Sequence, residues 1–452
     1  MRTPTDPTVP RHPVRWAEIG LTALAGALHL RALAAEEPWF DEAFSIVVAS
    51  GSLRDLWALS LADQVHPPGF SLLLWLWMRL GSTDLAWLRL FPALAATLSV
   101  PALMEAGRAV RLSPRAILAA GALAATSPLL LEMSRELRTY APLVLVTTLT
   151  LIAVLRRQRV RIVGGYVVLA GLHYFGALAV AALVGGAIVR DRPRWRTALV
   201  EALPAAALLS AWLALVVGHA RGDVGPDASW IPAVGLAGVV DLPIRLVGTF
   251  ATPAGTLLVI GVFVCALALT IRDRALAPII ALGLLPPALT IALEALSGRH
   301  LWVVRYLIIV GPAWWLLIAA GIDRLTGWGA RLGVIALVGW AALAGVHAEA
   351  ARPRKPTWSA VARALAGRNG ITLCAHEDYV ALPLRYQAVS RRIPLRIVGL
   401  ARCNARTRPD GYLLRPGTEA ILQTVASRGA TLGAPRDLGT DRPATLVIPL
   451  RW

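Results

Sequence analysis

The acidic residues Asp41 and Glu42 are adjacent in the motif EEPWFDEAFS, just beyond the first long apolar stretch of the chain. A carboxylate acts as a general base when it reaches an attacking hydroxyl within hydrogen-bond distance. Asp41 and Glu42 are therefore the candidate catalytic residues. The alternative is that they form only a solvated acidic rim together with Glu36 and Glu37, because acids beside helix ends are common.

Basic residues follow in two further motifs. His66 lies in DQVHPPGF, where two prolines impose an extended turn, and it could donate a hydrogen bond to a phosphate or a carboxylate. In MSRELRTYAP, the guanidinium groups of Arg135 and Arg138 could hold a phosphate by bidentate hydrogen bonds. The simpler interpretations are a plain helix start at HPP, and an Arg135–Glu136 pair at the level of lipid headgroups.

Polar residues also interrupt two later apolar stretches. His173 and Tyr174 break LAGLHYFGALA, and such a break is tolerated only where protein or water satisfies the freed backbone groups. His173 could equally be a packing residue inside a helix bundle. Arg299 and Arg305 lie in GRHLWVVRYLIIVGP, where both could serve as interfacial anchors.

The composition predicts a membrane protein. Of the 452 residues, 56% are hydrophobic and 16% are charged, and the mean hydropathy is +0.61. Soluble proteins contain about 25% charged residues, and a single soluble core could not bury this much apolar surface. A helix needs about 20 mainly apolar residues to cross a bilayer. Runs of this kind predict eleven spans, at 17–35, 84–106, 116–132, 141–155, 162–174, 175–190, 197–217, 254–271, 275–296, 306–322 and 331–348.

Two of these regions allow more than one topology. The pair 162–174 and 175–190 is either a broken hairpin around HYFG or one long tilted helix. The apolar segment 68–81 is short, and we interpret it as a helix in the outer interface, with Trp75 and Trp77 at the depth that indoles prefer.

The distribution of arginine orients the spans, because short cytoplasmic loops accumulate basic residues. With the N-terminus inside, the inner segments carry 18 basic and 4 acidic residues, whereas the short outer segments carry 8 basic and 10 acidic residues. The net charge of +18 therefore records orientation rather than nucleic-acid binding. An odd number of spans places the tail outside.

Three regions follow from this reading. Residues 1–16 form a cytoplasmic arm, residues 17–348 the transmembrane domain with its first outer loop at 36–83, and residues 349–452 a small extracytoplasmic α/β domain. In the tail, a helix from KPTWSAVARALAG precedes strand candidates that include PLRIVG, GYLLR and TLVIPL. Cys374 and Cys403 both lie in this tail and could pair, and no CxxC motif indicates a zinc site.

Taken in order, the motifs WFDEAFS, HPPGFSLLLWLWMRLG, SRELRTYAP, HYFGAL and VVRYLIIVGP resemble those of the GT-C superfamily of integral-membrane glycosyltransferases. The sequence is similar to the branch of bacterial lipopolysaccharide sugar transferases, which is related to protein O-mannosyltransferases and to the lipid A aminoarabinose transferase. The resemblance covers about residues 15–180 and returns at Arg305 and Tyr306.

The resemblance implies an all-α polytopic glycosyltransferase of the bacterial inner membrane. Its reaction would be the inverting transfer of a sugar from a polyprenyl-phosphate donor to a hydroxyl of a glycan, lipid or protein acceptor on the outer face. Asp41 matches the catalytic base of the superfamily and Glu42 its neighbour. Arg305 lies where relatives carry a basic residue near the lipid phosphate.

The remaining motif positions divide between donor and acceptor. The residues expected to bind the donor phosphate are Arg138, Arg305, His66 and Arg135. Those expected to bind the acceptor or the sugar are Glu136, Tyr140, His173 and Tyr174. Relatives carry at the position of Glu136 an acid that holds a metal or orients the acceptor. Because the second outer loop lacks a DxD or ExD pair, we assign no cofactor, and a divalent metal at Glu136 remains an open alternative.

Two other classes of function compete with a transferase. A transporter or lipid flippase for an anionic lipid-linked substrate would also place acids and arginines along a path, but transporters tend to repeat broken helices in two halves, and the sequence lacks that symmetry. A non-catalytic assembly subunit could use its basic tail to bind cell-envelope phosphates. That hypothesis leaves the order of three motifs unexplained, namely the acidic pair in WFDEAFS, the HPP turn and the ExRxY pattern of Glu136, Arg138 and Tyr140.

Overall fold

The computed structural model describes most of the chain up to residue 325 and selected segments beyond it. The described residues are 11–219, 231–248, 252–325, 327, 336, 339–341, 343–347, 350, 371–375, 395–399, 411–414, 431–432, 436–437, 445–447 and 449–451.

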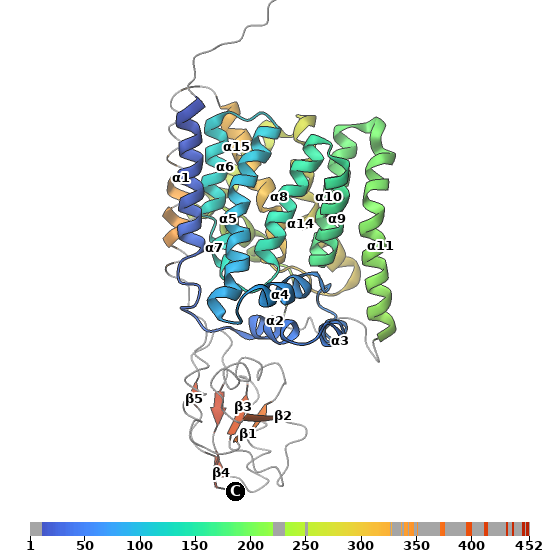
Figure 1. Ribbon diagram of the computed structural model, residues 1–452. Helices are drawn as coiled ribbons and strands as arrows, with labels where there is room; N and C mark the ends of the chain where they lie inside the picture. The colour runs from blue at the N-terminus through green and yellow to red at the C-terminus, as the bar shows by residue number, and fades with distance from the viewer. Residues whose placement is uncertain are drawn as a thin grey trace, which may run out of the picture.

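Helices of 7 to 25 residues stand side by side and form a bundle (Figure 1). They are α1 (Arg11–His29), α5 (Leu85–Ala109), α6 (Pro114–Ala125), α7 (Pro128–Ser134), α8 (Tyr140–Arg156), α9 (Arg159–Leu172), α10 (Tyr174–Arg190), α11 (Trp195–His219), α12 (Leu236–Val247), α13 (Pro253–Thr270), α14 (Ala277–Ser297) and α15 (Gly311–Arg324). Three further helices lie across one end of the bundle, namely α2 (Phe40–Ser50), α3 (Leu53–Asp63) and α4 (Gly69–Leu80). Single 3-10 turns precede three of the long helices, at η1 (Arg192–Arg194), η2 (Arg274–Leu276) and η3 (Tyr306–Val310).

The helical, polytopic character predicted from the sequence is confirmed. Within the described residues, five helices are long and apolar enough to cross a membrane, or six if α6 and α7, which meet at 54°, form one broken span. The five are Leu85–Ala109, Arg192–His219, Pro253–Thr270, Arg274–Ser297 and Tyr306–Arg324. α4, α8 and α10 are apolar but shorter. The number of eleven spans stays a prediction, and half of the last predicted span, 331–348, lies outside the described residues.

Local sequence signals start several helices where the bundle requires a turn. Ser113 and Thr252 are N-caps whose hydroxyl groups accept from backbone N–H groups in the first turns of α6 and α13, and a proline follows each of them. Such a proline fits the first helical position because its missing N–H has no partner there in any case. At α3, Ser52 and Asp55 form a reciprocal capping box.

The predicted interruption at HYFG is a hairpin of two helices. His173 has an extended backbone, with φ −163° and ψ 148°, and it separates α9 from α10. A Cβ atom added to Gly176 would overlap the carbonyl oxygen of Leu169, so the first turn of α10 packs directly on the backbone of α9. At the far ends of the two helices, Arg157 and Asp191 form an ion pair of 2.9 Å. One long tilted helix is thereby excluded.

The segments predicted to be cytoplasmic meet at one end of the bundle. Arg108 pairs with Glu18 there, and the backbone N–H of Ser113 donates to Asp323 at 3.0 Å. The helices α2 to α4 lie at the opposite end (Figure 1). The two sets of segments thus separate as the arginine distribution predicts, whereas the side of the membrane that each end faces stays a prediction.

The described strands of the tail form a five-stranded mixed sheet and a separate two-stranded sheet, beyond the end that carries α2 to α4 (Figure 1). The strands are β1 (Ile371–Ala375), β2 (Leu395–Gly399), β3 (Gly411–Leu414), β4 (Thr431–Leu432), β5 (Arg436–Asp437), β6 (Thr445–Val447) and β7 (Pro449–Arg451). The larger sheet has the order β2-β1-β3-β6-β5, with β1 parallel to β2 and β3, and β4 pairs with β7. The helix predicted before β1 lies outside the described residues. Cys374 is disulfide-bonded, and its predicted partner, Cys403, lies outside them as well.

Candidate active site

A buried ion pair fixes the start of the first outer loop. Glu42 lies in the first turn of α2 with a fully buried side chain, and both of its carboxylate oxygens accept from Arg89 of α5, at 2.8 and 2.7 Å. The same carboxylate accepts from the backbone N–H of Leu137 in the second outer loop, at 2.9 Å. One acid therefore ties α2, α5 and the second outer loop together.

Arg89 extends this connection to the end of the first helix. Its guanidinium also donates to the backbone carbonyls of Leu33, Glu36 and Glu37, at 2.8, 2.7 and 3.3 Å. These contacts use all five of its N–H donors, and the side chain is only 2% exposed. The carboxylate of Glu42 is thus enclosed by donors from Arg89 and from the backbone of Leu137.

Asp41, the neighbouring acid, occupies a different environment. One of its carboxylate oxygens lies 3.4 Å from the guanidinium of Arg305, and its side chain keeps 12% of its surface exposed. The guanidinium of Arg305 also lies over the rings of Trp39, Tyr140 and Tyr306, at 5.3, 6.0 and 5.7 Å from their centroids. A partly exposed carboxylate beside an arginine is therefore found at the end of the bundle formed by the outer segments.

Arg138 approaches the same acid from the second outer loop. Its guanidinium donates to the hydroxyl of Ser45 at 3.2 Å and to the backbone carbonyl of Asp41 at 3.4 Å. Its other terminal nitrogen lies 3.3 Å from Nε2 of His66. Two predicted phosphate ligands, Arg138 and His66, are thus in contact with each other.

Electrostatics assign the protonation of His66. Burial first, and then the positive charges of Arg138 and Arg305, hold the pKa of His66 well below its usual value, although Asp41 acts in the opposite direction. In the neutral ring, Nε2 accepts from Arg138 and Nδ1 faces the carboxylate of Asp63 at 3.5 Å. Burial raises the pKa of Asp63 to about 6, against the opposing charge of Arg138.

Aromatic rings pack next to this polar group. The ring of His173 lies 5.0 Å from that of His66 and 4.9 Å from that of Tyr306, and Tyr140 stacks on Tyr306 at 5.9 Å. Nδ1 of His173 accepts from the N–H of Phe175, which leaves the proton of the neutral ring on Nε2. Within the described residues, neither that nitrogen nor the hydroxyl of Tyr140 has a hydrogen-bond partner, although both are buried.

A close backbone contact brings the two histidines together. A Cβ atom added to Gly69, at the start of α4, would overlap the carbonyl oxygen of Gly171 near the end of α9. The HPP turn therefore lies directly on the break between α9 and α10. A cavity of about 20 Å³, lined by Ser45, Asp63, His66 and Arg138 among others, remains beneath this contact. It has room for a single water molecule.

The other predicted site residues lie at the margin of this cluster. Glu136 is 5% exposed, and its charge acts on Arg89 and Arg305. Arg135 ends α7 with a backbone bond to Glu132. The hydroxyl of Tyr174 is used elsewhere, since it donates to the carbonyl of Gln64 and accepts from Trp212.

No metal-binding group accompanies Glu136. Within the part of the chain that the structure describes, three or more His, Cys, Asp or Glu side chains nowhere gather in a way that could hold a metal ion.

Two residues of the site were missed in the sequence. Arg89 lies inside an apolar span, and an ionisable residue at such a position is a signal of function in its own right. Asp63 is the first residue of the motif DQVHPPGF, in which only His66 was predicted to belong to the site. Its contact with His66 becomes visible only when the turn between α3 and α4 is formed.

Comparison with known proteins identifies the fold. No family model and no curated protein sequence matches the chain. Among solved structures, ArnT from Cupriavidus metallidurans bound to undecaprenyl phosphate superposes with a TM-score of 0.63 at 14% identity, covering 96% of this chain and 98% of that chain. Its apo form gives a TM-score of 0.60 with the same coverage. The protein O-mannosyltransferase Pmt1-Pmt2 complex of S. cerevisiae overlaps 47% of this chain, at a TM-score of 0.33 and 14% identity.

The ArnT comparison spans nearly the whole of both chains, including the region from 181 to 300 where the sequence motifs are sparse. The order of motifs and the superposition agree on one architecture. The chain therefore has the fold of ArnT, and its motifs resemble those of the GT-C superfamily of membrane glycosyltransferases.

Proposed function

We propose that this protein is an inverting glycosyltransferase that moves a sugar from a polyprenyl-phosphate donor to an acceptor hydroxyl, at the outer face of the bacterial inner membrane. The observation that carries the proposal is the contact of Asp41 with Arg305, beside Arg138. A candidate base and two cations, contributed by the first and second outer loops and by the segment before η3, lie together at one end of the bundle.

In the proposed reaction, Asp41 accepts the proton of the acceptor hydroxyl. The hydroxyl oxygen attacks the anomeric carbon from the face opposite the phosphate, and the bond from that carbon to the phosphate oxygen breaks. The departing lipid phosphate takes the electron pair. Its pKa is low, so it needs no general acid, and Arg138 and Arg305 stabilise the charge that develops on it.

The contact between Asp41 and Arg305 has a function in this scheme. At 3.4 Å it is longer than a charge-assisted hydrogen bond. A donor phosphate competes for the guanidinium of Arg305, and its binding turns the carboxylate of Asp41 toward the acceptor. Donor binding thereby prepares the base, which stays in contact with Arg305 until a donor is bound.

Glu42 contributes by position in this proposal. Because its carboxylate is enclosed by Arg89 and by the N–H of Leu137, it holds the residue next to Arg138 at a fixed place. The prediction that Glu42 takes part in the chemistry is replaced here by a positioning role. Tyr140 and His173 present a buried hydroxyl and a buried N–H beside Arg305 and His66, and we assign them to the hydroxyl groups of the sugar or the acceptor.

The fold supports the class of donor. In the solved structure of ArnT, undecaprenyl phosphate is bound by a chain of the same architecture, which agrees with a polyprenyl phosphate as carrier here. The identity of the sugar depends on the lining of the site, and the motifs do not extend to it.

The variant Asp41→Asn tests the proposal. Purified protein is incubated with radiolabelled polyprenyl-phosphate sugars and membrane glycolipids extracted from the producing cells, and the release of free polyprenyl phosphate is measured. Loss of the general base is expected to reduce the rate by about 10²- to 10⁴-fold, with unchanged thermal unfolding. Asp84→Asn, which alters an exposed acid before α5, is the control and should keep full activity. Near-normal release by Asp41→Asn would remove Asp41 as the base, and absence of release by the wild-type protein would contradict a transferase.

A further inference from the structure

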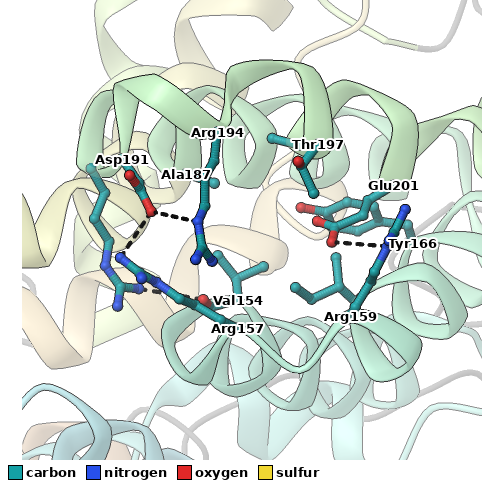
Figure 2. A pocket seen from close by; sticks show the side chains of 12 residues that line it. Val154, Arg157, Arg159, Tyr166, Ala187, Asp191, Arg194, Thr197 and Glu201 are labelled. Atoms are coloured by element: carbon teal, nitrogen blue, oxygen red, sulfur yellow. Dashed lines mark hydrogen bonds and ion pairs between the residues drawn. The ribbon is translucent and has the colours of Figure 1, made fainter.

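A pocket of about 250 Å³ opens at the end of the bundle opposite Asp41. It lies between the last turn of α8, the first turn of α9, the last turn of α10 and the start of α11, and Figure 2 shows its lining. None of its lining residues belongs to the candidate active site. Its position at the end where the predicted cytoplasmic segments meet also separates it from the proposed donor site.

The pocket has a positive rim. Its lining contains four arginines against two acids, Asp191 and Glu201. Arg157 and Arg194 both contact one carboxylate oxygen of Asp191, at 2.9 and 3.3 Å, and Arg159 lies 3.8 Å from Glu201. In Figure 2 these two groups of charges lie at the two ends of the pocket.

The arginine side chains retain hydrogen-bonding capacity. Arg157, Arg159 and Arg194 are 50%, 66% and 60% exposed, and each reaches its acid through a single nitrogen. A guanidinium carries five N–H donors in a planar fork that suits phosphate. The fourth arginine, Arg190, instead donates to the carbonyls of Val154 and Leu155 at the end of α8, and so holds the wall of the pocket.

The depth of the pocket matches the level of lipid headgroups. The candidate membrane span that contains α11 begins at Arg192, and the indole of Trp195 is 46% exposed at its start, as is usual at a membrane interface. Only 17% of the apolar window of this span is buried within the protein, so α11 stands at the edge of the bundle. Below the charged rim the lining is apolar, with Val154, Ile162 and Ala198.

We propose that this pocket binds the phosphate headgroup of an anionic bilayer lipid, with Arg157 and Arg194 on the phosphate and the first acyl carbons against the apolar wall. The excess of two positive charges in the lining favours an anionic over a zwitterionic headgroup. The change from a basic rim to an apolar wall favours a lipid over a soluble phosphate. Basic pockets between transmembrane helices on the cytoplasmic side bind such headgroups in other proteins.

The test uses the full-length protein in detergent and native mass spectrometry. Phosphatidylglycerol is titrated as the probe, with phosphatidylcholine as the zwitterionic comparison. Two variants remove the site in different ways: Arg157→Gln with Arg194→Gln removes two charges, and Thr197→Trp fills the pocket from an exposed lining position without changing its charge. Arg115→Gln, which alters an exposed arginine in another predicted cytoplasmic segment, is the matched control.

Wild-type protein and Arg115→Gln are expected to retain phosphatidylglycerol and to prefer it to phosphatidylcholine. The double variant should bind phosphatidylglycerol about 30-fold more weakly, which corresponds to ~2 kcal/mol for two arginines, and Thr197→Trp should lose the preference as well. Equal retention of the two lipids by the wild-type protein would overturn the proposal, and this measurement needs no variant to fold. Displacement of the lipid by millimolar inorganic phosphate would overturn the assignment to a lipid in favour of a soluble phosphate. Because retention is measured without sugar transfer, its outcome is independent of the proposed reaction.

Discussion

The contact between Glu42 and Arg89 predicts a large loss of stability when one partner is removed. Arg89→Met deletes two hydrogen bonds to the carboxylate and three to backbone carbonyls. It leaves the fully buried charge of Glu42 with backbone donors alone. Breaking one side of a buried pair costs about 3–5 kcal/mol, so we expect the free energy of unfolding to fall by that amount.

The measurement is unfolding by sodium dodecyl sulfate in mixed micelles, followed by tryptophan fluorescence. Arg79→Met is the control, because Arg79 is an exposed arginine at the same end of the bundle, and its loss should cost about 1 kcal/mol or less. In the double variant with Glu42→Gln, no buried charge remains without its partner. The double variant should therefore be more stable than the sum of the single changes predicts, by about 1–3 kcal/mol.

The same perturbation should weaken donor binding. Glu42 holds the N–H of Leu137, so its release shifts Arg138, and the KM for the donor should rise more than kcat falls. Two results would refute the positioning role of Glu42. The first is that Arg89→Met loses no more unfolding free energy than Arg79→Met. The second is that the losses from Glu42→Gln and Arg89→Met simply add in the double variant.

Three further outcomes follow from the site. Arg305→Ala should raise the KM for a polyprenyl-phosphate donor by about tenfold or more. Arg305→Lys should restore a low KM only in part, because a lysine cannot form the bidentate contact. Equal donor KM values for Arg305→Ala and the wild-type protein in steady-state assays would exclude a phosphate contact. The raised pKa of Asp63, about 6 against 3.8, means that its contribution to stability is present at low pH and is lost as the pH rises through 6. The difference in unfolding free energy between the wild-type protein and Asp63→Asn should therefore change by about 1.4 kcal/mol between pH 5 and pH 7.5, and a flat difference would contradict the burial of this acid. Tyr140→Phe removes a buried hydroxyl that has no partner among the described residues, so it should raise stability by about 1 kcal/mol while lowering kcat/KM; unchanged turnover would show that the hydroxyl does not contact substrate.

The sequence was sufficient to predict a helical, polytopic protein, because apolar length and arginine distribution are direct consequences of the bilayer; the number of spans and their orientation stay predictions. The count of charged residues placed the segments that carry Asp41, Arg138 and Arg305 on the same side of the membrane, and these residues do lie together in the structure. The hairpin at His173 could not be distinguished from a tilted helix, because the choice depends on the contact between Gly176 and the backbone of α9. Such a contact leaves no periodic pattern in the sequence.

The different roles of Asp41 and Glu42 were likewise invisible before the fold was known. Adjacent positions on a helix point about 100° apart, so one carboxylate faces Arg89 in the interior and the other faces the more open side. Which of the two does so depends on the rotation of α2 about its axis. That rotation is set by partners 47 and 95 residues away in the chain.

The contact of Gly69 with Gly171 has a mechanical consequence. No side chain separates the start of α4 from the end of α9, so the first outer loop has no compressible layer at this point. Any movement of that loop that admits a lipid-linked donor must carry the break between α9 and α10 with it, or else part from it completely. In the first case His66 and His173 stay together, and in the second they separate. The proposed entry of the donor would then be coupled to the packing of these two rings.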